Sequence, residues 1–361
     1  MYRFAAASAA LLATTAIAQA DIERTNQSLR ILYEDTGDLG SYVELSYGSI
    51  MPEAGANGYS NPLTDYDLTS IGYLYRFNDQ FSVAMLYDQP FGAGVDYTPG
   101  VPFFDGEAAV ESDAITVVGR YEINDRFSVH AGVRALAVEG DIYTNVAGQV
   151  FHLLEGESDW GYGYVVGAAY EIPDIALRVA LTYNSAIEVS FDADETPFNP
   201  ATGTPVGPTA QANFDVEFPE SINLEFQSGI AENTLIFGSI RHAFWDGFRL
   251  STTVGDYVNF TSDSTTYTLG VGRQFNDNWA GSVSYLHRTD GTIPSDTALA
   301  PTTGLDSVTL GLRYTRDAFT ISGSLTLGVP GDQVVQNGIV GDIDFDDNFV
   351  SAVGVRVGFR F

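Results

Sequence analysis

The stretch that decides the fold reads LTSIGYLYRFNDQFSVAMLYDQ and spans residues 68–89. Apolar residues fill alternate positions in both halves, from Ile71 to Phe77 and from Phe81 to Tyr87. A period of two is typical of β-strands with one apolar face. Asn78-Asp79-Gln80 separates the halves, and Asn and Asp favour a tight turn because they tolerate the αL conformation that closes it. The stretch therefore predicts a β-hairpin.

The same turn sequence recurs as INDRF at residues 123–127 and as FNDNW at residues 275–279. Further alternating segments fill most of the chain, and they number about fourteen. They span residues 42–51, 68–77, 81–89, 107–123, 127–143, 159–172, 177–191, 214–230, 235–248, 265–275, 279–289, 305–314, 319–328 and 349–361. Tight turns follow Phe77, Ile123, Ile172, Ile230, Phe275 and Tyr314, and longer connections alternate with them.

Short turns on one side, long loops on the other and an even number of strands are typical of transmembrane β-barrels. Aromatic residues at the strand ends match the interfacial girdles of such barrels. The alternative is a soluble β-sandwich, because alternation alone does not say whether the apolar face meets lipid or a protein core. We predict an all-β fold, a transmembrane antiparallel β-barrel formed by residues 41–361, with both ends on the side of the short turns.

The first twenty residues predict a secretory signal peptide, residues 1–20. Arg3 precedes an apolar stretch from Ala5 to Ile17, and Ala18-Gln19-Ala20 has the pattern of a cleavage site. A transmembrane helix is the alternative, but the apolar stretch is too short to span a bilayer. The chain has no cysteine, which excludes disulfides and Cys-metal sites.

Charge excludes nucleic acid as a partner, because the 16 basic residues, all Arg, are outnumbered by 47 acidic residues and the net charge is −31. Acidic runs at residues 192–195 and 342–347 fall in expected loops. They form a solvated surface or, alternatively, bind divalent cations that bridge the barrel to outer-membrane lipids. Arginines on the polar face of the strands share that face with Glu44, Asp88, Glu122 and Glu139, so internal ion pairs are expected. No catalytic or metal-binding motif is present, and we predict neither an enzyme nor a cofactor.

Three motifs in the second half resemble a known family, the FadL/TodX-type outer-membrane long-chain fatty acid transporters. Pro219-Glu220-Ser221 resembles the family's P-x-S motif, and Trp245-Asp246-Gly247-Phe248 resembles W-x-x-F. Tyr267, followed by Phe275-Asn276-Asp277-Asn278-Trp279, resembles the motif that ends in F-x-D-N-W. The terminal Phe361 also agrees with the family.

The resemblance implies a barrel of about fourteen strands whose N-terminal segment folds inward as a hatch. Ligand is captured at outer loops, enters a pocket beside the hatch and leaves sideways at a kinked third strand. By this resemblance residues 21–40 form the hatch, which is shorter than usual for the family and lacks its Asn-Pro-Ala signature; a simple tether is the alternative. The predicted pocket residues of the hatch are Leu29, Ile31, Leu32 and Tyr33.

Two further sites follow from the residues and the resemblance together. Proline and glycine weaken strand pairing, so a kink that opens the wall is expected at Gln89, Pro90, Phe91 and Gly92; alternatively, Pro90 ends the strand and starts an outer loop. Exposed apolar clusters commonly bind ligands, and the connection after Tyr143 has one. It comprises Val146, Val150, Phe151, Leu153 and Leu154, which either capture ligand or pack on neighbouring loops.

The predicted function is passive uptake of hydrophobic molecules across the Gram-negative outer membrane by a monomer. The resemblance implies long-chain fatty acids as the substrate. Two alternatives are a general porin for small polar solutes and a structural or adhesion barrel that transports nothing.

Overall fold

The computed structural model describes residues 22–37, 39–56, 60–97, 104–146, 149–199, 204–252, 256–292, 300–335 and 342–361. The predicted signal peptide, residues 1–20, lies outside this range and stays a prediction. No helix in these described parts is long and apolar enough to cross a membrane.

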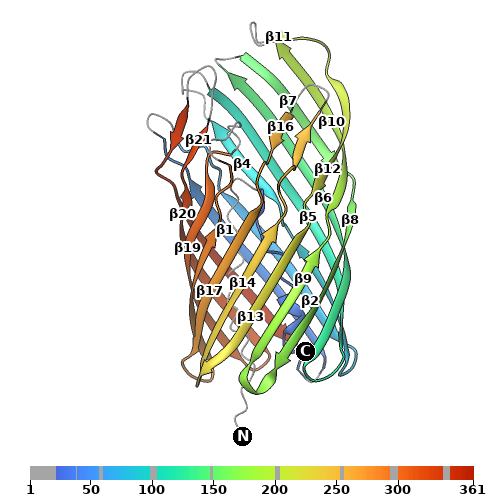
Figure 1. Ribbon diagram of the computed structural model, residues 1–361, viewed down its shortest axis with the longest axis vertical. Coiled ribbons are helices and arrows are strands. Elements are labelled where there is room, and N and C mark those ends of the chain that lie inside the picture. The colour runs from blue at the N-terminus through green and yellow to red at the C-terminus, as the bar shows by residue number, and fades with distance from the viewer. Residues whose placement is uncertain are drawn as a thin grey trace.

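The chain forms a closed antiparallel β-barrel of 14 strands (Figure 1). The first crossing, β1, pairs with β2 on one side and with β23 on the other, and this closes the barrel. In chain order, the strands (β) and the short 3-10 helices (η) of the described residues are η1 (Arg30–Tyr33), β1 (Ser41–Glu53), β2 (Tyr66–Arg76), β3 (Phe81–Asp88), β4 (Gly92–Tyr97), β5 (Phe104–Glu122), β6 (Phe127–Val146), β7 (Gln149–Ser158), β8 (Gly161–Ile172), η2 (Pro173–Ile175), β9 (Leu177–Asn184), β10 (Ile187–Asn199), β11 (Thr204–Pro205), β12 (Ala210–Phe218), β13 (Ser221–Ala231), β14 (Thr234–Ala243), β15 (Arg249–Ser251), β16 (Asp256–Asn259), β17 (Ser264–Gln274), β18 (Trp279–Arg288), β19 (Thr303–Arg316), β20 (Phe319–Gly331), β21 (Gln333–Val335), β22 (Ile343–Phe345) and β23 (Phe349–Arg360).

Four crossings consist of two consecutive strands with a short interruption: β3 with β4, β7 with β8, β9 with β10, and β12 with β13. The predicted strands at residues 177–191 and 214–230 are therefore interrupted, at residues 185–186 and 219–220. The hairpins β15–β16 and β21–β22 belong to separate two-stranded sheets between barrel strands.

In the part of the barrel near the short turns, at the bottom of Figure 1, the apolar face of the strands points outward. Leu269 and Leu310, on β17 and β19, are 53% and 55% exposed, whereas Arg134 and Arg241 are 4% exposed in the lumen. A soluble sandwich would bury the apolar residues instead, so the exposures exclude that alternative. The predicted luminal ion pairs form, among them Arg120 with Glu122 and Glu171. Glu139 is an exception, because its side chain is exposed.

The three recurrent turns use a different geometry from the predicted one. Asn78 accepts hydrogen bonds from the backbone N–H groups of Gln80 and Phe81, each at 2.9 Å. Asn124 and Asn276 accept the equivalent pairs. None of the nine loop residues has a positive φ, so the side chain of Asn, acting as a local acceptor, closes these turns. Positive φ occurs instead in the other tight turns, at Ala176, Asn233 and Asp317.

Candidate functional site

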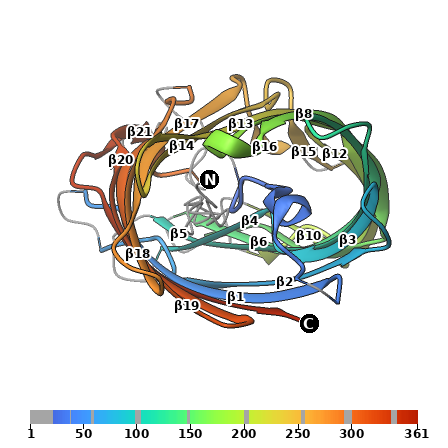
Figure 2. The same ribbon diagram turned by 90° about the horizontal axis from the view of Figure 1, so that it is seen from below.

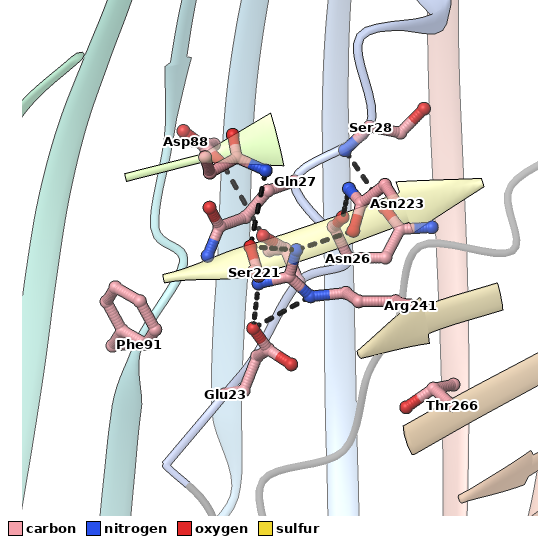
Figure 3. A network of polar contacts seen from close by, with 12 residues as sticks. Glu23, Asn26, Gln27, Ser28, Asp88, Phe91, Ser221, Asn223, Arg241 and Thr266 are labelled. Atoms are coloured by element: carbon pink, nitrogen blue, oxygen red, sulfur yellow. Dashed lines mark hydrogen bonds and ion pairs between the residues drawn. The ribbon is translucent and has the colours of Figure 1, made fainter. Parts of the chain in front are cut away.

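The N-terminal segment, residues 22–37, lies inside the barrel and includes η1 (Figure 2). A polar network fixes its first half to the wall (Figure 3). Arg241 donates from Nε to Glu23 Oε1 at 2.9 Å and pairs with the same oxygen through Nη2. Its Nη1 donates to Ser221 and Asn223, and Asn223 donates in turn to the backbone carbonyl of Asn26 at 2.9 Å. One luminal arginine thus links β13, β14 and the segment.

The second half of the segment is held by charge and by stacking. Arg30 pairs with Glu34 at 2.7 Å and with Glu44 of β1 at 2.6 Å. The ring of Tyr33 lies between the guanidinium groups of Arg120 and Arg178, whose Cζ atoms are 4.5 and 4.4 Å from its centroid. Both contacts are cation–π interactions, and such interactions are stronger when they are shielded from water.

The predicted hatch residues pack on the wall. Leu29, Ile31 and Leu32 are at most 2% exposed and form one cluster with apolar luminal side chains of the wall. The wall residues of this cluster are Tyr42, Leu74, Ala84, Val118 and Val165. Such burial anchors the segment.

The third crossing loses its pairing with the second where the kink is predicted. Pairing of β2 with β3 runs from Ile71–Tyr87 to Arg76–Ser82. The next strand, β4, pairs with β5, and among the described residues it has a single bridge to the chain before β2, Val95 with Leu63. The side chain of Gln89 accepts from the N–H of Thr69 at 2.9 Å, in place of a backbone partner. The crossing continues as β4, so the alternative that Pro90 starts an outer loop is wrong.

The N-terminal segment pairs with the kink. Arg24 N donates to Pro90 O and Gly92 N donates to Ile22 O, both at 2.7 Å, and Glu23 bridges to Phe91. Because proline has no N–H to offer, the pairing uses its carbonyl and the N–H of Gly92. The hydroxyl group of Ser112, on β5, donates to the backbone carbonyl of Phe91 at 2.7 Å. This bond also holds Phe91 to the wall.

An apolar cavity of about 90 Å³ lies above this point, between the upper wall and the β15–β16 hairpin. Among the described residues no charged side chain lines it. Its aromatic lining includes Phe191 stacked on Phe214 at 5.2 Å, and Phe248 at 5.6 Å from Phe218 and 5.4 Å from Phe260. The N-terminal segment contributes Ile22. A concave site with an apolar lining suits a hydrophobic ligand.

An aromatic cluster joins this cavity to the kink. Trp245, 1% exposed, packs edge-on against Phe248 at 5.0 Å and against Phe91 at 5.9 Å. Phe91 also lies 4.7 Å from Phe218. The third crossing, the N-terminal segment and the cavity wall therefore form one packed unit.

A second cavity, of about 100 Å³, adjoins the end of the β2–β3 pairing. Its lining combines luminal side chains such as Glu44 and Arg134 with Tyr47 and Ile71, which are 50% and 47% exposed on the outer face. Of the four predicted pocket residues of the hatch, Ile31 alone lines it. This cavity thus lies on the wall where the pairing of β2 with β3 ends.

The prediction of a loop after Tyr143 is wrong. Residues 143–146 and 149–153 pair with each other as the end of the β6–β7 hairpin. Leu154 is 3% exposed and lines the apolar cavity. The side chains of the other predicted capture residues, Val146, Val150, Phe151 and Leu153, lie outside the described parts of the structure. A role of this apolar group in capture stays a prediction.

The acidic run at residues 192–195 also lies in a strand, β10. Asp192 and Asp194 are exposed, whereas Glu195 is buried and accepts a hydrogen bond from Tyr257 at 2.8 Å. Within the described ranges no group of acidic or histidine side chains has the arrangement of a metal site.

A sequence model of the family described as "Outer membrane protein transport protein (OMPP1/FadL/TodX)" matches residues 1–318. The chain belongs to this family. It is therefore a β-barrel of the Gram-negative outer membrane. No curated protein sequence matches the chain.

Several solved structures share the fold. A FadL homologue of Pseudomonas aeruginosa has a TM-score of 0.73 at 14% identity, with 89% of this chain and 90% of that chain covered. The toluene transporter TodX of Pseudomonas putida has a TM-score of 0.63 at 14% identity, with 99% and 98% covered. CymD, a monoaromatic hydrocarbon channel, has a TM-score of 0.65 at 14% identity, with 93% and 94% covered.

Two of the motifs that resemble the FadL/TodX family lie at the site. Ser221 of the first motif accepts from Arg241, and Trp245 and Phe248 of the second form the aromatic cluster. The third motif forms the turn that Asn276 closes. Sequence reasoning missed Ile22, Glu23 and Arg241. Ile22 and Glu23 are the second and third residues after the predicted cleavage site, which was the one available signal, and nothing local marks Arg241 as a partner of the segment.

Proposed function

We propose that this barrel takes up hydrophobic molecules, long-chain fatty acids in particular, by passive diffusion through the apolar cavity. The observation that carries the proposal is a cavity with an aromatic and aliphatic lining, enclosed by a barrel whose other luminal residues are largely polar. A hydrocarbon chain leaves water when it enters such a site, and each buried CH₂ group contributes about 0.8 kcal/mol.

The proposed exit is sideways, at the kinked third crossing. The loss of pairing after Tyr87 and the second cavity, which adjoins that point of the wall, support this path. A hydrophobic molecule that leaves there enters the lipid directly and avoids the polar lumen below. The N-terminal segment, as the proposed hatch, blocks that lumen.

Monoaromatic hydrocarbons are the second candidate substrate. Two of the similar structures are described as a toluene transporter and a monoaromatic hydrocarbon channel, and the stacked rings of Phe191 and Phe214 offer a surface for an aromatic ligand. A general porin is a weaker alternative, because the N-terminal segment occupies the lumen through which polar solutes would pass.

The variant Ala108→Trp tests the proposal by filling the cavity. Ala108 is 4% exposed and lines the cavity, so a large ring there competes with ligand for space. Overpacking of this kind lowers the stability of a folded protein by about 1–3 kcal/mol. Because the ring takes the space of the ligand, we expect uptake of radiolabelled hexadecanoic acid to fall about tenfold. Uptake is measured in cells that lack their own transporter of this family.

Ala109→Trp is the matched control, since Ala109 is the next residue of β5 and is exposed on the opposite face. Equal uptake by the two variants, with both present as folded barrels in the outer membrane, would show that ligand does not use this cavity.

A further inference from the structure

Arg24 lies in the chain between residues that line the two cavities. Ile22, two residues before it, lines the apolar cavity, and Thr25, the next residue, lines the second one. Its guanidinium lies over the ring of Tyr66, with Cζ 4.3 Å from the centroid, and Tyr66 itself lines the apolar cavity. A ligand that passes from the first cavity to the second therefore meets this pair.

Arg24 lacks the partners that the other arginines of the segment and its surroundings have. It is 4% exposed and its Nε has no hydrogen-bond partner. In the described parts of the chain no carboxylate lies within 4 Å of its guanidinium, whereas Arg30 and Arg241 both have ion pairs. Burial lowers the pKa of Arg24, and Tyr66 and the more distant charge of Glu111 offset this in part. A buried cation without a close anion is costly, which indicates that an anion completes the site.

We propose that Arg24 binds the carboxylate of an amphipathic ligand whose hydrocarbon tail lies in the apolar cavity. The inference rests on the proposed function and adds a residue that selects acids over neutral hydrocarbons of the same size. An arginine stacked on an aromatic ring still presents the edge of its guanidinium, which fits a carboxylate through two parallel hydrogen bonds. Among the described residues the lining of the apolar cavity itself has no cation that could take this part.

Gly92 and Gly94 offer a test that leaves the charge of the chain unchanged. Both lie on β4, and a Cβ on Gly92 would collide with the guanidinium of Arg24, the flexible end of its side chain. A Cβ on Gly94 would collide with the hydroxyl of Thr64 instead. Gly92→Ala therefore displaces Arg24, and Gly94→Ala is its matched control.

The experiment compares uptake of hexadecanoic acid with that of its methyl ester, in cells that lack their own transporter of this family. Arg24→Gln should lower the preference for the acid about tenfold, since it removes a charged hydrogen-bond donor, and leave uptake of the ester unchanged. Gly92→Ala should lower the same preference, Gly94→Ala should not, and Arg24→Lys should give an intermediate value because it keeps the charge without the fork.

The outcomes separate this inference from the proposed function. If the folded Arg24→Gln and Gly92→Ala barrels keep the acid-to-ester preference of the unchanged protein, Arg24 binds no carboxylate, although the barrel still carries hydrophobic molecules. If the unchanged protein takes up neither compound, the proposed function is wrong and the inference is overturned with it.

Discussion

Deletion of residues 22–35 is expected to turn the barrel into an ion-conducting pore. The segment lies across the lumen and is joined to β1 through Arg30, to β14 through Glu23 and to β13 through Asn26. Without it, the luminal faces of the strands, rich in Ser, Thr and Arg, would border a water-filled channel. The closure of the wall by β1 and β23 uses residues outside the deleted stretch, so the barrel itself should persist.

Planar bilayers measure this effect directly. The full chain should give no stable single-channel steps, and the deletion variant should give discrete open steps. A variant with residues 22–35 replaced by a Gly-Ser stretch of equal length is the control, because it keeps the chain but loses every anchor; it should conduct as well. A full-length protein that conducts as strongly as the deletion variant would favour the general porin.

Arg241→Leu is expected to release the first half of the N-terminal segment. Glu23 is 1% exposed, and the substitution would leave its carboxylate buried without a partner. Loss of one partner of a buried ion pair costs about 3–5 kcal/mol. Ser221 and Asn223 would also lose their donor. The released stretch would give up its backbone hydrogen bonds with Pro90 and Gly92.

Hydrogen exchange at the amides of Arg24 and Gly92 reports on this release, since both donate across the contact. Protection should fall by a factor of at least about 100. The double variant Glu23→Leu/Arg241→Leu should recover most of it, because no unpaired charge remains. Arg360→Leu, which breaks the more exposed pair with Asp35, should change protection by less than about 1 kcal/mol. Unchanged protection in Arg241→Leu would mean that this ion pair does not hold the segment.

The barrel could be predicted from the sequence because its signals are local. Alternation with a period of two and the Asn-Asp turns are visible within about twenty residues of any strand. The loss of pairing near residues 89–92 could be predicted for the same reason, since Pro90 and Gly92 weaken pairing wherever they occur in a strand. The interruption at residues 219–220 was missed, although Pro219 marks it, because alternation resumes directly after it.

The apolar cavity could not be predicted because the two faces of the wall exchange character along its height. Low in the barrel the exposed face is apolar, as at Val133, whereas high in the same strand β6 Val138 and Ile142 are buried and Glu139 and Asp141 are exposed. Alternation shows that two faces differ but does not say which one meets the lumen. Alternation therefore does not reveal that the segment after Tyr143 extends a strand.

The polar contacts of the N-terminal segment could not be predicted from the sequence for another reason. Glu23 and Arg241 are 218 positions apart, and a single sequence gives no signal for so distant a pair. Arg24 is next to Glu23 in the chain and carries an equally ordinary side chain, yet the fold gives one residue an ion pair and leaves the other without one.

The central claim is that hydrophobic molecules cross this barrel through the apolar cavity. The position of a bound ligand is the most direct test of it. In crystals of the full chain grown with 16-bromohexadecanoic acid, anomalous scattering locates the bromine at the end of the tail. We predict a bromine peak among Phe191, Phe218 and Phe248. A peak confined to the lipid-facing surface, with the cavity empty, would contradict the account.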